Sequence, residues 1–266
     1  MKRNYLTVAF LVLVAIILLF PIYILFMTSF KSANELFTAT LWPHFPTLDN
    51  IRAALSSKFL VSIRTSLVVS ITVTVVAMLL HAMCGYALAR FDFPFKDTLF
   101  RIIISTLLIP SMTILVPLFM IAKFLGITNS YAGLILPALF NAYGIFLFRQ
   151  FYLGFPRELE EAAEVEGCSK ARIFFTIALP LSKPIIIPLT IAFFLGNWNN
   201  YLWPLVVNKK ESLYTVQVYL ANMVSGYSTP WNKVIASSML AAIPVFILFL
   251  IAQRYLQEGI KTTGFK

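Results

Sequence analysis

Charged residues are scarce in this chain. Asp, Glu, Lys and Arg make up only 12% of its 266 residues, and 59% of the residues are hydrophobic. Soluble domains carry roughly 25% charged residues, so the composition predicts a membrane protein. The formal net charge of +10 does not point to nucleic acid, because the basic residues stand in short pieces between apolar runs. Lys and Arg in such places typically mark the cytoplasmic ends of membrane spans.

Several kinds of functional site are missing as well. The two cysteines, Cys84 and Cys168, predict neither a disulfide nor a metal site. The sequence has no GxxxxGK[ST] phosphate-binding loop and no Ser/His/Asp or HExxH arrangement. We therefore expect that this chain is not an enzyme and that it binds no metal or cofactor.

Acidic residues are also absent from the long apolar runs. Proton-coupled carriers usually need carboxylates within the membrane, so their absence argues against a self-powered carrier. A secondary carrier or channel that uses backbone carbonyls remains an alternative, as does a membrane scaffold without transport. His81 is the one ionisable residue in a run, either as a hydrogen-bonded packing residue or as a switch.

Six charge-free stretches are long enough to cross a bilayer, which takes about 20 helical residues. They predict an all-α membrane protein with a single transmembrane domain over residues 1–266. Long continuous runs favour helices over barrel strands, which alternate every second residue. The expected spans are residues 6–29, 65–89, 102–122, 131–148, 184–207 and 234–253.

Prolines within these stretches predict kinks. They are Pro110, Pro117, Pro137, Pro188 and Pro244.

The distribution of positive charge predicts the orientation. With a cytoplasmic N-terminus, the inside segments hold thirteen of the 21 Lys and Arg residues and the outside segments hold the other eight. We therefore expect both termini in the cytoplasm. The same orientation puts the loop 149–183, between spans four and five, on the cytoplasmic side.

This loop contains the stretch FPRELEEAAEVEGCSKARIFFTIALP, which predicts a helix over about residues 156–166. Pro156 suits the first turn of a helix, and the glutamates after it suit the positive end of the helix dipole. Gly167 suits the left-handed residue that follows a helix. Ser169 can cap a second helix, which we expect Pro180 and Pro184 to end.

The result is a helix–glycine–helix elbow. Its first arm has an acidic side, which arginines of a partner could pair with. Ala162 and Ala163 give it a smooth side that lets a partner backbone come close. The alternative is a solvated loop that is made of good helix formers.

A fixed spacing in the loop resembles the EAA loop of ABC-importer permeases. Seven residue types at fixed offsets arise by chance at about one in 10⁸ per start position. The residues are Glu161, Ala162, Ala163, Gly167, Ile177, Leu179 and Pro180.

Other stretches are similar to the carbohydrate-uptake branch of these permeases, and in particular to its maltose/glycerol-phosphate-type second permease. They are FPIYILFMTSFKS, GYALARFDFPFKD, FLFRQFYLGFP and GNWNNYLWPLVV.

This resemblance implies a permease subunit without an ATPase site in a bacterial or archaeal plasma (inner) membrane. A second permease subunit would pair with it, and two ATP-binding subunits on the cytoplasmic side would bind ATP and Mg. An extracytoplasmic solute-binding protein would deliver a carbohydrate-like solute. The loop 156–180 would enter a cleft on an ATPase, which would move the spans between inward- and outward-facing states.

The resemblance also implies roles for residues of the loop. Glu161 would pair with a basic residue of the cleft, and the two alanines after it would permit close contact. Gly167 would form the elbow, and Leu179 and Pro180 would join the elbow to span five.

Span five itself contains GNWNNYLWP, which suggests a lining for the solute path. Asparagine amides can form hydrogen bonds with sugar hydroxyls, and aromatic rings can stack on sugar rings. The alternative is a set of interhelical contacts with the partner permease. The candidate path residues are Asn197, Trp198, Asn200 and Tyr201, with Asn141 in span four.

Overall fold

Helices make up the framework of the chain. The computed structural model describes residues 5–224 and 229–263, and no strand occurs within those ranges. Three of the helices there are each long and apolar enough to cross a membrane. They are α1 (Tyr5–Ser29), α3 (Ser57–Arg90) and α14 (Trp231–Thr263, with the apolar part ending at Gln253).

Three helix pairs, each bent at a short break, supply the remaining apolar segments. The first joins α4 (Lys96–Ser105) and the 3-10 turn Thr106–Leu108 to α5 (Ser111–Phe124), with a bend of 107°. The second joins α6 (Tyr131–Ile135) and the 3-10 turn Leu136–Ala138 to α7 (Ala142–Leu153), with a bend of 42°. The third joins residues Lys170–Leu181 to α11 (Lys183–Trp198), with a bend of 75°.

The prediction of one continuous helix over residues 102–122 is therefore wrong. Ile109 is extended (φ −88°, ψ 118°), and α5 begins directly after Pro110. Proline pushes the residue before it out of the helical region and lacks the N–H that a helix needs. Pro137 likewise lies in the short turn of the second pair. In contrast, Pro117, Pro188 and Pro244 lie inside unbroken helices.

The predicted span 184–207 is also interrupted. Its first helix, α11, ends at Trp198, and a separate short helix, α12, covers Leu202–Val207. Pro204 lies in the first turn of α12, where its missing N–H is tolerated, but it could not continue a helix from residues 199–201. The structure thus places the asparagines of GNWNN at a helix end.

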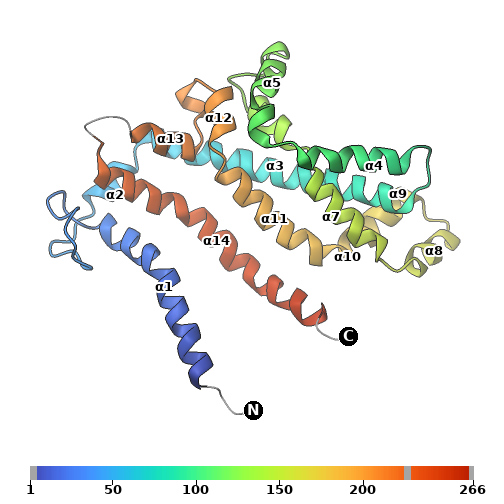
Figure 1. The fold of residues 1–266 in the computed structure, drawn as a ribbon, viewed down its shortest axis with the longest axis horizontal. Coiled ribbons are helices and arrows are strands. Elements are labelled where there is room, and N and C mark those ends of the chain that lie inside the picture. The colour runs from blue at the N-terminus through green and yellow to red at the C-terminus, as the bar shows by residue number, and fades with distance from the viewer. Residues whose placement is uncertain (1–4, 225–228, 264–266) are drawn as a thin grey trace.

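Helix α3 lies at the centre of the molecule, beside α7 and α11 (Figure 1). Its close contact with α7 depends on Gly85, because a Cβ there would lie 2.6 Å from the Cβ of Phe148. Small residues allow this kind of close approach between membrane helices. Around the contact, Tyr86, Phe148 and Tyr152 form part of a buried cluster that reaches α11.

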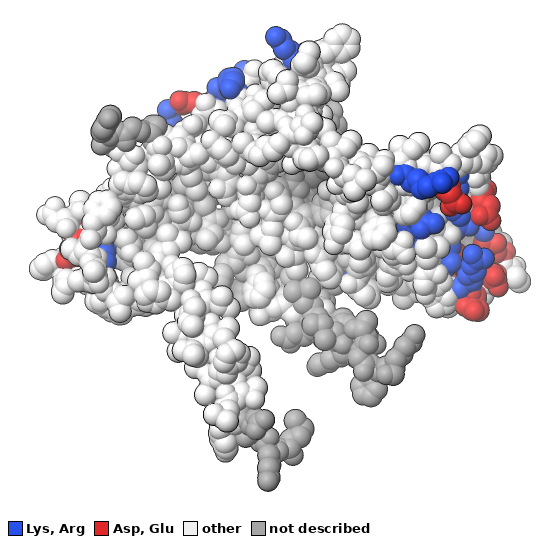
Figure 2. Space-filling view, in the orientation of Figure 1, with Lys and Arg blue, Asp and Glu red and all other residues white. Residues whose placement is uncertain are grey.

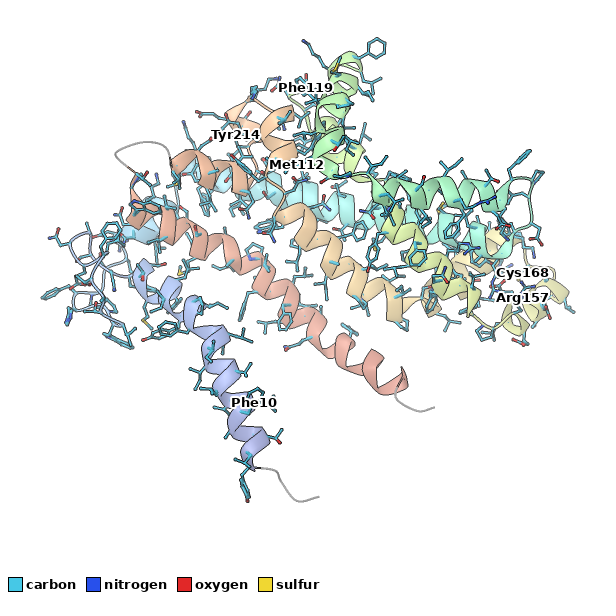
Figure 3. The ribbon with its side chains drawn as sticks, viewed as in Figure 1. Phe10, Met112, Phe119, Arg157, Cys168 and Tyr214 are labelled. Atoms are coloured by element: carbon cyan, nitrogen blue, oxygen red, sulfur yellow. The ribbon has the colours of Figure 1, made fainter. Side chains whose placement is uncertain are left out.

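Helix α1 is the least buried of the long helices. None of its most apolar 18-residue window is buried within the chain, and Phe10, which is labelled in Figure 3, is 64% exposed. Its end is held by Asn50 of α2 (Asp49–Ala54), whose amide nitrogen donates to the carbonyl oxygens of Ser29 and Lys31 at 3.1 and 2.7 Å. Helix α14 joins this contact through Asn232, 3.1 Å from the Asn50 side-chain oxygen.

Charged side chains are unevenly distributed over the face shown in Figure 2. Acidic and basic residues gather at one end of the molecule, where α3 ends, α4 begins and the loop after α7 lies. The opposite end carries α2, α13 (Val216–Met223) and a 3-10 turn at Glu211–Leu213. Between the two ends, the visible charge is confined to a few side chains along the upper edge, over α5 and near α12 (Figure 2). The rest of this surface is free of charge, as expected for a surface in contact with lipid.

Candidate functional site

The loop at the charged end contains two helical arms. The first, α8, covers Glu158–Val165 and begins two residues later than the sequence predicts. Pro156 precedes the N-cap residue Arg157, whose carbonyl oxygen accepts the backbone N–H groups of Glu160 and Glu161. Three glutamates stand in the first turn, where the helix dipole favours negative charge.

A left-handed glycine separates the arms. Gly167 has a φ of +82°, in the region that the sequence predicts for it. Its N–H donates to the carbonyl oxygen of Glu164, and that of Cys168 donates to Ala163, which is the Schellman pattern of a helix end. Ser169 then caps the second arm by accepting the N–H of Arg172 at 3.3 Å. Arg157 and Cys168 are labelled in Figure 3.

The second arm contains a π-helical segment. It runs from α9 (Lys170–Ile173) through the π-helix Phe174–Ala178 to α10 (Leu179–Leu181). The N–H of Leu179 donates to the carbonyl oxygen of Phe174, five residues back. The sequence predicts that Pro180 and Pro184 end this arm, and the helix stops between these two prolines, at Leu181. Pro180 continues in α10, because a proline is tolerated at the start of a helical segment.

The bend between the second arm and α11 is fixed by side chains. The Ser182 hydroxyl forms hydrogen bonds with the Ala178 carbonyl oxygen at 2.6 Å and with the Tyr152 hydroxyl at 2.9 Å. Ser182 is fully buried, and Tyr152 belongs to α7. The bend therefore contacts the helix before the loop as well as the helix after it.

The predicted coupling residues differ in exposure. Glu161, Ala162 and Pro180 are exposed, and Leu179 is half-buried against the cluster around Tyr86. Ala163, in contrast, is 7% exposed and faces the interior of the chain. Its small side chain serves the packing of the loop, which leaves Glu161 and Ala162 on the accessible face of α8.

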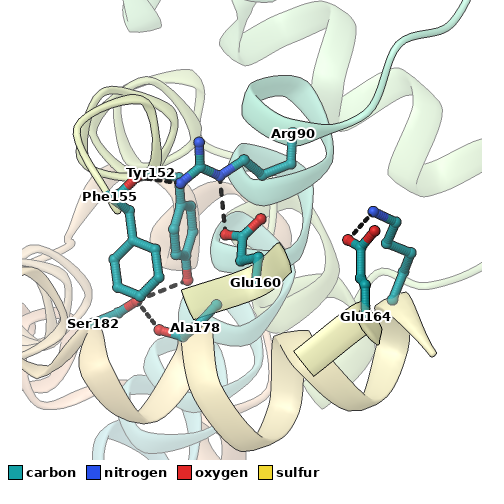
Figure 4. A network of polar contacts seen from close by, with 8 residues as sticks. Arg90, Tyr152, Phe155, Glu160, Glu164, Ala178 and Ser182 are labelled. Carbon is teal, nitrogen blue, oxygen red and sulfur yellow. Dashed lines mark hydrogen bonds and ion pairs between the residues drawn. The ribbon is translucent and has the colours of Figure 1, made fainter. Parts of the chain in front are cut away.

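A buried ion pair at the same place was not predicted from the sequence. Arg90, the last residue of α3, donates from Nε to the Glu160 carboxylate at 3.0 Å, and the two side chains are only 5% and 10% exposed. Arg90 also donates to the carbonyl oxygen of Phe155 (Figure 4). The available signal was the spacing of Glu160 and Ala163, because residues three apart share a helix face.

A second ion pair crosses the elbow on its surface. Lys170 at the start of the second arm pairs with Glu164 of α8 (Figure 4). Their side chains are 56% and 39% exposed, so solvent screens this pair and its contribution to stability is small.

Two of the candidate path residues lie together. Asn141, at the break between α6 and α7, and Asn197, near the end of α11, line the same cavity of about 390 Å³. The Asn141 side-chain oxygen also caps α7 by accepting the N–H groups of Tyr143 and Gly144 at 3.0 and 3.2 Å. The other lining residues are Ala138, Phe140, Tyr143, Ala192, Phe193 and Gly196.

The other candidates lie elsewhere. Trp198 is 2% exposed and stacks on Phe194, with 5.7 Å between ring centroids. Asn200 lines a different cavity of about 280 Å³, together with Met112 of α5. Tyr201 is 37% exposed. The break after Trp198 separates these residues, which a continuous helix would have placed along one span.

His81 lies behind the Asn141 cavity. It is 1% exposed, and its Nε2 lies 3.0 Å from the Leu139 carbonyl oxygen and 3.1 Å from the Asn141 backbone nitrogen. A Cβ on Gly144 would lie 2.4 Å from its Nδ1. His81 thus packs at the break between α6 and α7, where its Nε2 donates to the Leu139 carbonyl oxygen in one tautomer or accepts the Asn141 N–H in the other. Among the described residues, no three metal-binding side chains cluster in a way that could hold an ion.

Comparison with known proteins gives the family. A family model described as "Binding-protein-dependent transport system inner membrane component" matches residues 81–262. The arabinooligosaccharides transport system permease protein AraQ of Halalkalibacterium halodurans is 35% identical over 259 residues, which cover 95% of this chain and 93% of that protein. The sn-glycerol-3-phosphate transport system permease protein UgpE of Yersinia pestis is 33% identical over 261 residues, with 94% and 93% covered.

A solved structure has the same fold. A chain in the crystal structure of a bacterial ABC transporter involved in the import of the acidic polysaccharide alginate matches with a TM-score of 0.85. It is 22% identical in sequence, and the match covers 95% of each chain. The present chain belongs to the family of binding-protein-dependent transport system inner membrane components, and it is a permease, a transport subunit and not an ATPase.

Proposed function

We propose that this permease works in an importer for a carbohydrate-like solute and that its α8 elbow receives movement from an ATP-binding subunit. The observation that carries the proposal is the accessible face of α8. Glu161 and Ala162 are exposed at the end of the molecule where charge gathers. The first arm, which contains them, contacts α3 through Glu160 and Arg90, and the second arm leads into α11 through the bend at Ser182. A partner bound to this face would therefore act on the membrane helices through a rigid connection.

The chemistry of this face suits a cleft with basic residues. The first turn of α8 carries Glu158, Glu160 and Glu161, and Glu160 is occupied by Arg90. Glu161 is thus available for an arginine or lysine of the ATPase. Gly167 sets the angle between the arms, while Leu179 and Pro180 connect the elbow to span five. ATP and Mg belong to the two ATP-binding subunits in this proposal.

A second permease subunit would cover the apolar surfaces that this chain leaves open. Helix α1 has no buried residue in its most apolar window. On α5, Met112, Val116 and Met120 are 62–65% exposed. Both helices need lipid or another protein around them, and a paired permease would supply part of that contact.

The solute would pass the cavity between the break in span four and α11. None of the residues that line this cavity is charged, and the lining combines Asn141 and Asn197 with aromatic residues. Amide groups and aromatic rings suit a neutral, hydroxylated solute. The relative AraQ is named for arabinooligosaccharide transport, which is consistent with this solute class. In this proposal Trp198 contributes packing, and Asn200 and Tyr201 lie farther along the path.

The proposed topology counts each bent pair as one span. Six spans then form one transmembrane domain over residues 1–266, with both termini and the α8 elbow in the cytoplasm of a bacterium. The uneven distribution of Lys and Arg in the sequence supports this orientation. An extracytoplasmic solute-binding protein would dock at the opposite end, near α2 and α13.

Reconstitution of the complete importer tests the proposal. In proteoliposomes, solute uptake is expected to require ATP, the ATP-binding subunits and the binding protein. Gly167→Pro should leave ATP hydrolysis in place and lower uptake at least about tenfold, a factor within the usual range of coupling between sites. Normal uptake by this variant would contradict the role of the elbow. Ion-driven uptake by the permease alone would support a secondary carrier instead.

A further inference from the structure

Arg90 and Glu160 connect two segments that are 70 residues apart in the sequence. Arg90 is the last residue of α3, and Glu160 is in the first turn of α8. The Arg90 Nε lies 3.0 Å from the Glu160 carboxylate, and both side chains are almost fully buried. A charge pair that is removed from solvent interacts more strongly than a surface pair and is screened less by salt.

The arginine binds the loop at a second point. Its Nη2 donates to the carbonyl oxygen of Phe155, and the guanidinium carbon lies 5.9 Å from the centre of the Phe155 ring. The planar fork of arginine suits two acceptors at once, which lysine cannot hold in the same way. Arg90 therefore forms hydrogen bonds with both α8 and the segment that leads into it (Figure 4).

Among the glutamates of α8, Glu160 is the one that pairs with a long helix. The only other carboxylate of α8 in a described ion pair, Glu164, binds Lys170 within the loop and lies on the surface. Glu160 is thus the acidic residue of α8 that reaches a long helix. The second arm has its own connection, because it continues into α11 through the bend at Ser182.

We propose that Arg90 and Glu160 are positioning residues for transport, and that they make the end of α3 move together with α8. Movement of the elbow would then reach the central helix directly, as well as α11 through the second arm. This inference rests on the proposed function, in which the elbow receives movement from an ATPase. It differs from a purely structural role, which would affect assembly and stability but not the amount of ATP used per solute.

The first test uses Glu160→Gln in the complete transporter. The amide keeps the shape of the side chain and an acceptor for Arg90, but it removes the charge. The expected result is an assembled complex in which the ATP hydrolysed per transported solute rises about five-fold, the lower end of usual coupling factors. An unchanged ratio in an assembled complex would overturn the inference.

Asp92→Asn is the matched control. Asp92 pairs with Lys96 at the same end of α3, but its side chain is 101% exposed and the pair does not involve α8. Loss of this surface pair should leave the ratio of ATP to solute unchanged. A rise equal to that of Glu160→Gln would show a general electrostatic effect at this end and would overturn the inference.

Arg90→Lys is the second test variant, for the case in which the complex with Glu160→Gln does not assemble. Lysine preserves the charge but cannot bind Glu160 and the Phe155 carbonyl through a rigid fork. The expected result is normal assembly with a raised ratio of ATP to solute. Tight coupling in this variant would count against the inference.

A distance measurement separates this inference from the proposed function. Spin labels at Asp92→Cys and Val165→Cys, in a background without the native cysteines, report the separation between the end of α3 and α8. Val165 is 89% exposed, so a label fits there. One narrow distance, equal with and without ATP, is expected, and Glu160→Gln should broaden it. A distance that changes with ATP in the unmodified pair would refute the joint movement, whether or not the ATPase docks on α8.

Discussion

Gly167 and Gly126 have the same left-handed backbone conformation. Both have positive φ angles, +82° and +69°, and an added Cβ would meet no atom within 4 Å at either position. Each N–H donates to the carbonyl oxygen three residues before it. The backbone conformation alone therefore favours glycine at both sites, whereas only Gly167 lies in the proposed coupling elbow.

Alanine at these two glycines should have equal structural and unequal functional effects. Gly167→Ala and Gly126→Ala are each expected to lower the free energy of unfolding by about 1 kcal/mol, because left-handed φ angles disfavour a Cβ. Gly167→Asn should cost less, since asparagine tolerates this region. Thermal unfolding of the purified complex and ATP use per solute would measure both effects. Coupling loss in Gly126→Ala, or none in Gly167→Ala, would contradict the elbow model.

Asn141 and Asn197 face one cavity, but only Asn141 also caps a helix. Asn141→Ala removes the cap of α7, which costs about 1 kcal/mol of stability, as well as a solute contact. The amide nitrogen of Asn197 bonds only within its own helix, to the Phe193 carbonyl oxygen at 2.8 Å. Asn197→Ala should therefore raise the solute concentration for half-maximal uptake about five-fold, equivalent to roughly 1 kcal/mol.

Thermal unfolding and uptake kinetics, measured on both variants, would test this division. Asn141→Asp serves as the control, because its carboxylate still accepts from the backbone N–H groups of α7. Unaltered uptake in both alanine variants would exclude this cavity from the solute path.

At the scale of elements, the packing of α3 on α7 depends on the absence of a side chain at Gly85. A Cβ there would come within 2.6 Å of the Phe148 Cβ and 2.8 Å of the Arg149 backbone nitrogen. Gly85→Ala should therefore separate the two helices and lower the free energy of unfolding by about 1–3 kcal/mol, the usual cost of overpacking. Thermal unfolding of the purified permease would measure the loss.

Gly196→Ala is the control for that measurement. Gly196 lies in α11, where an added Cβ would meet no atom within 4 Å. Alanine has the higher helix propensity, so its stability should stay equal or rise slightly. Equal losses in the two variants would mean that the close contact of α3 and α7 does not stabilise the fold.

The sequence was informative where local chemistry decides the structure. The lengths of apolar runs located the long helices, and Gly167 and Ser169 marked the end and start of the two arms. Proline was a less certain signal: Pro110 stands at a bend of 107°, whereas Pro188 lies inside an unbroken helix. The spacing of Glu160 and Ala163 puts these two residues on one face of α8, but it does not show that this face turns inward, because that depends on Arg90, 70 residues away.

At the scale of the whole molecule, the native cysteines offer a test of orientation. Cys168 is partly exposed next to Gly167, and Cys84 lies within α3. In a Cys84→Ser permease, a maleimide that cannot cross membranes is expected to label Cys168 only from the cytoplasmic face. Lys209→Cys in a permease without native cysteines should be labelled only from the outside. Labelling of Cys168 from the outside would invert the proposed topology.

The most direct measurement is a cross-link between α8 and an ATP-binding subunit. A photoreactive amino acid at Ala162, on the exposed face of α8, is expected to capture that subunit in the assembled transporter, while the same group at Lys209 should not. Failure to capture the subunit from Ala162 in every nucleotide state of an active transporter would contradict the account.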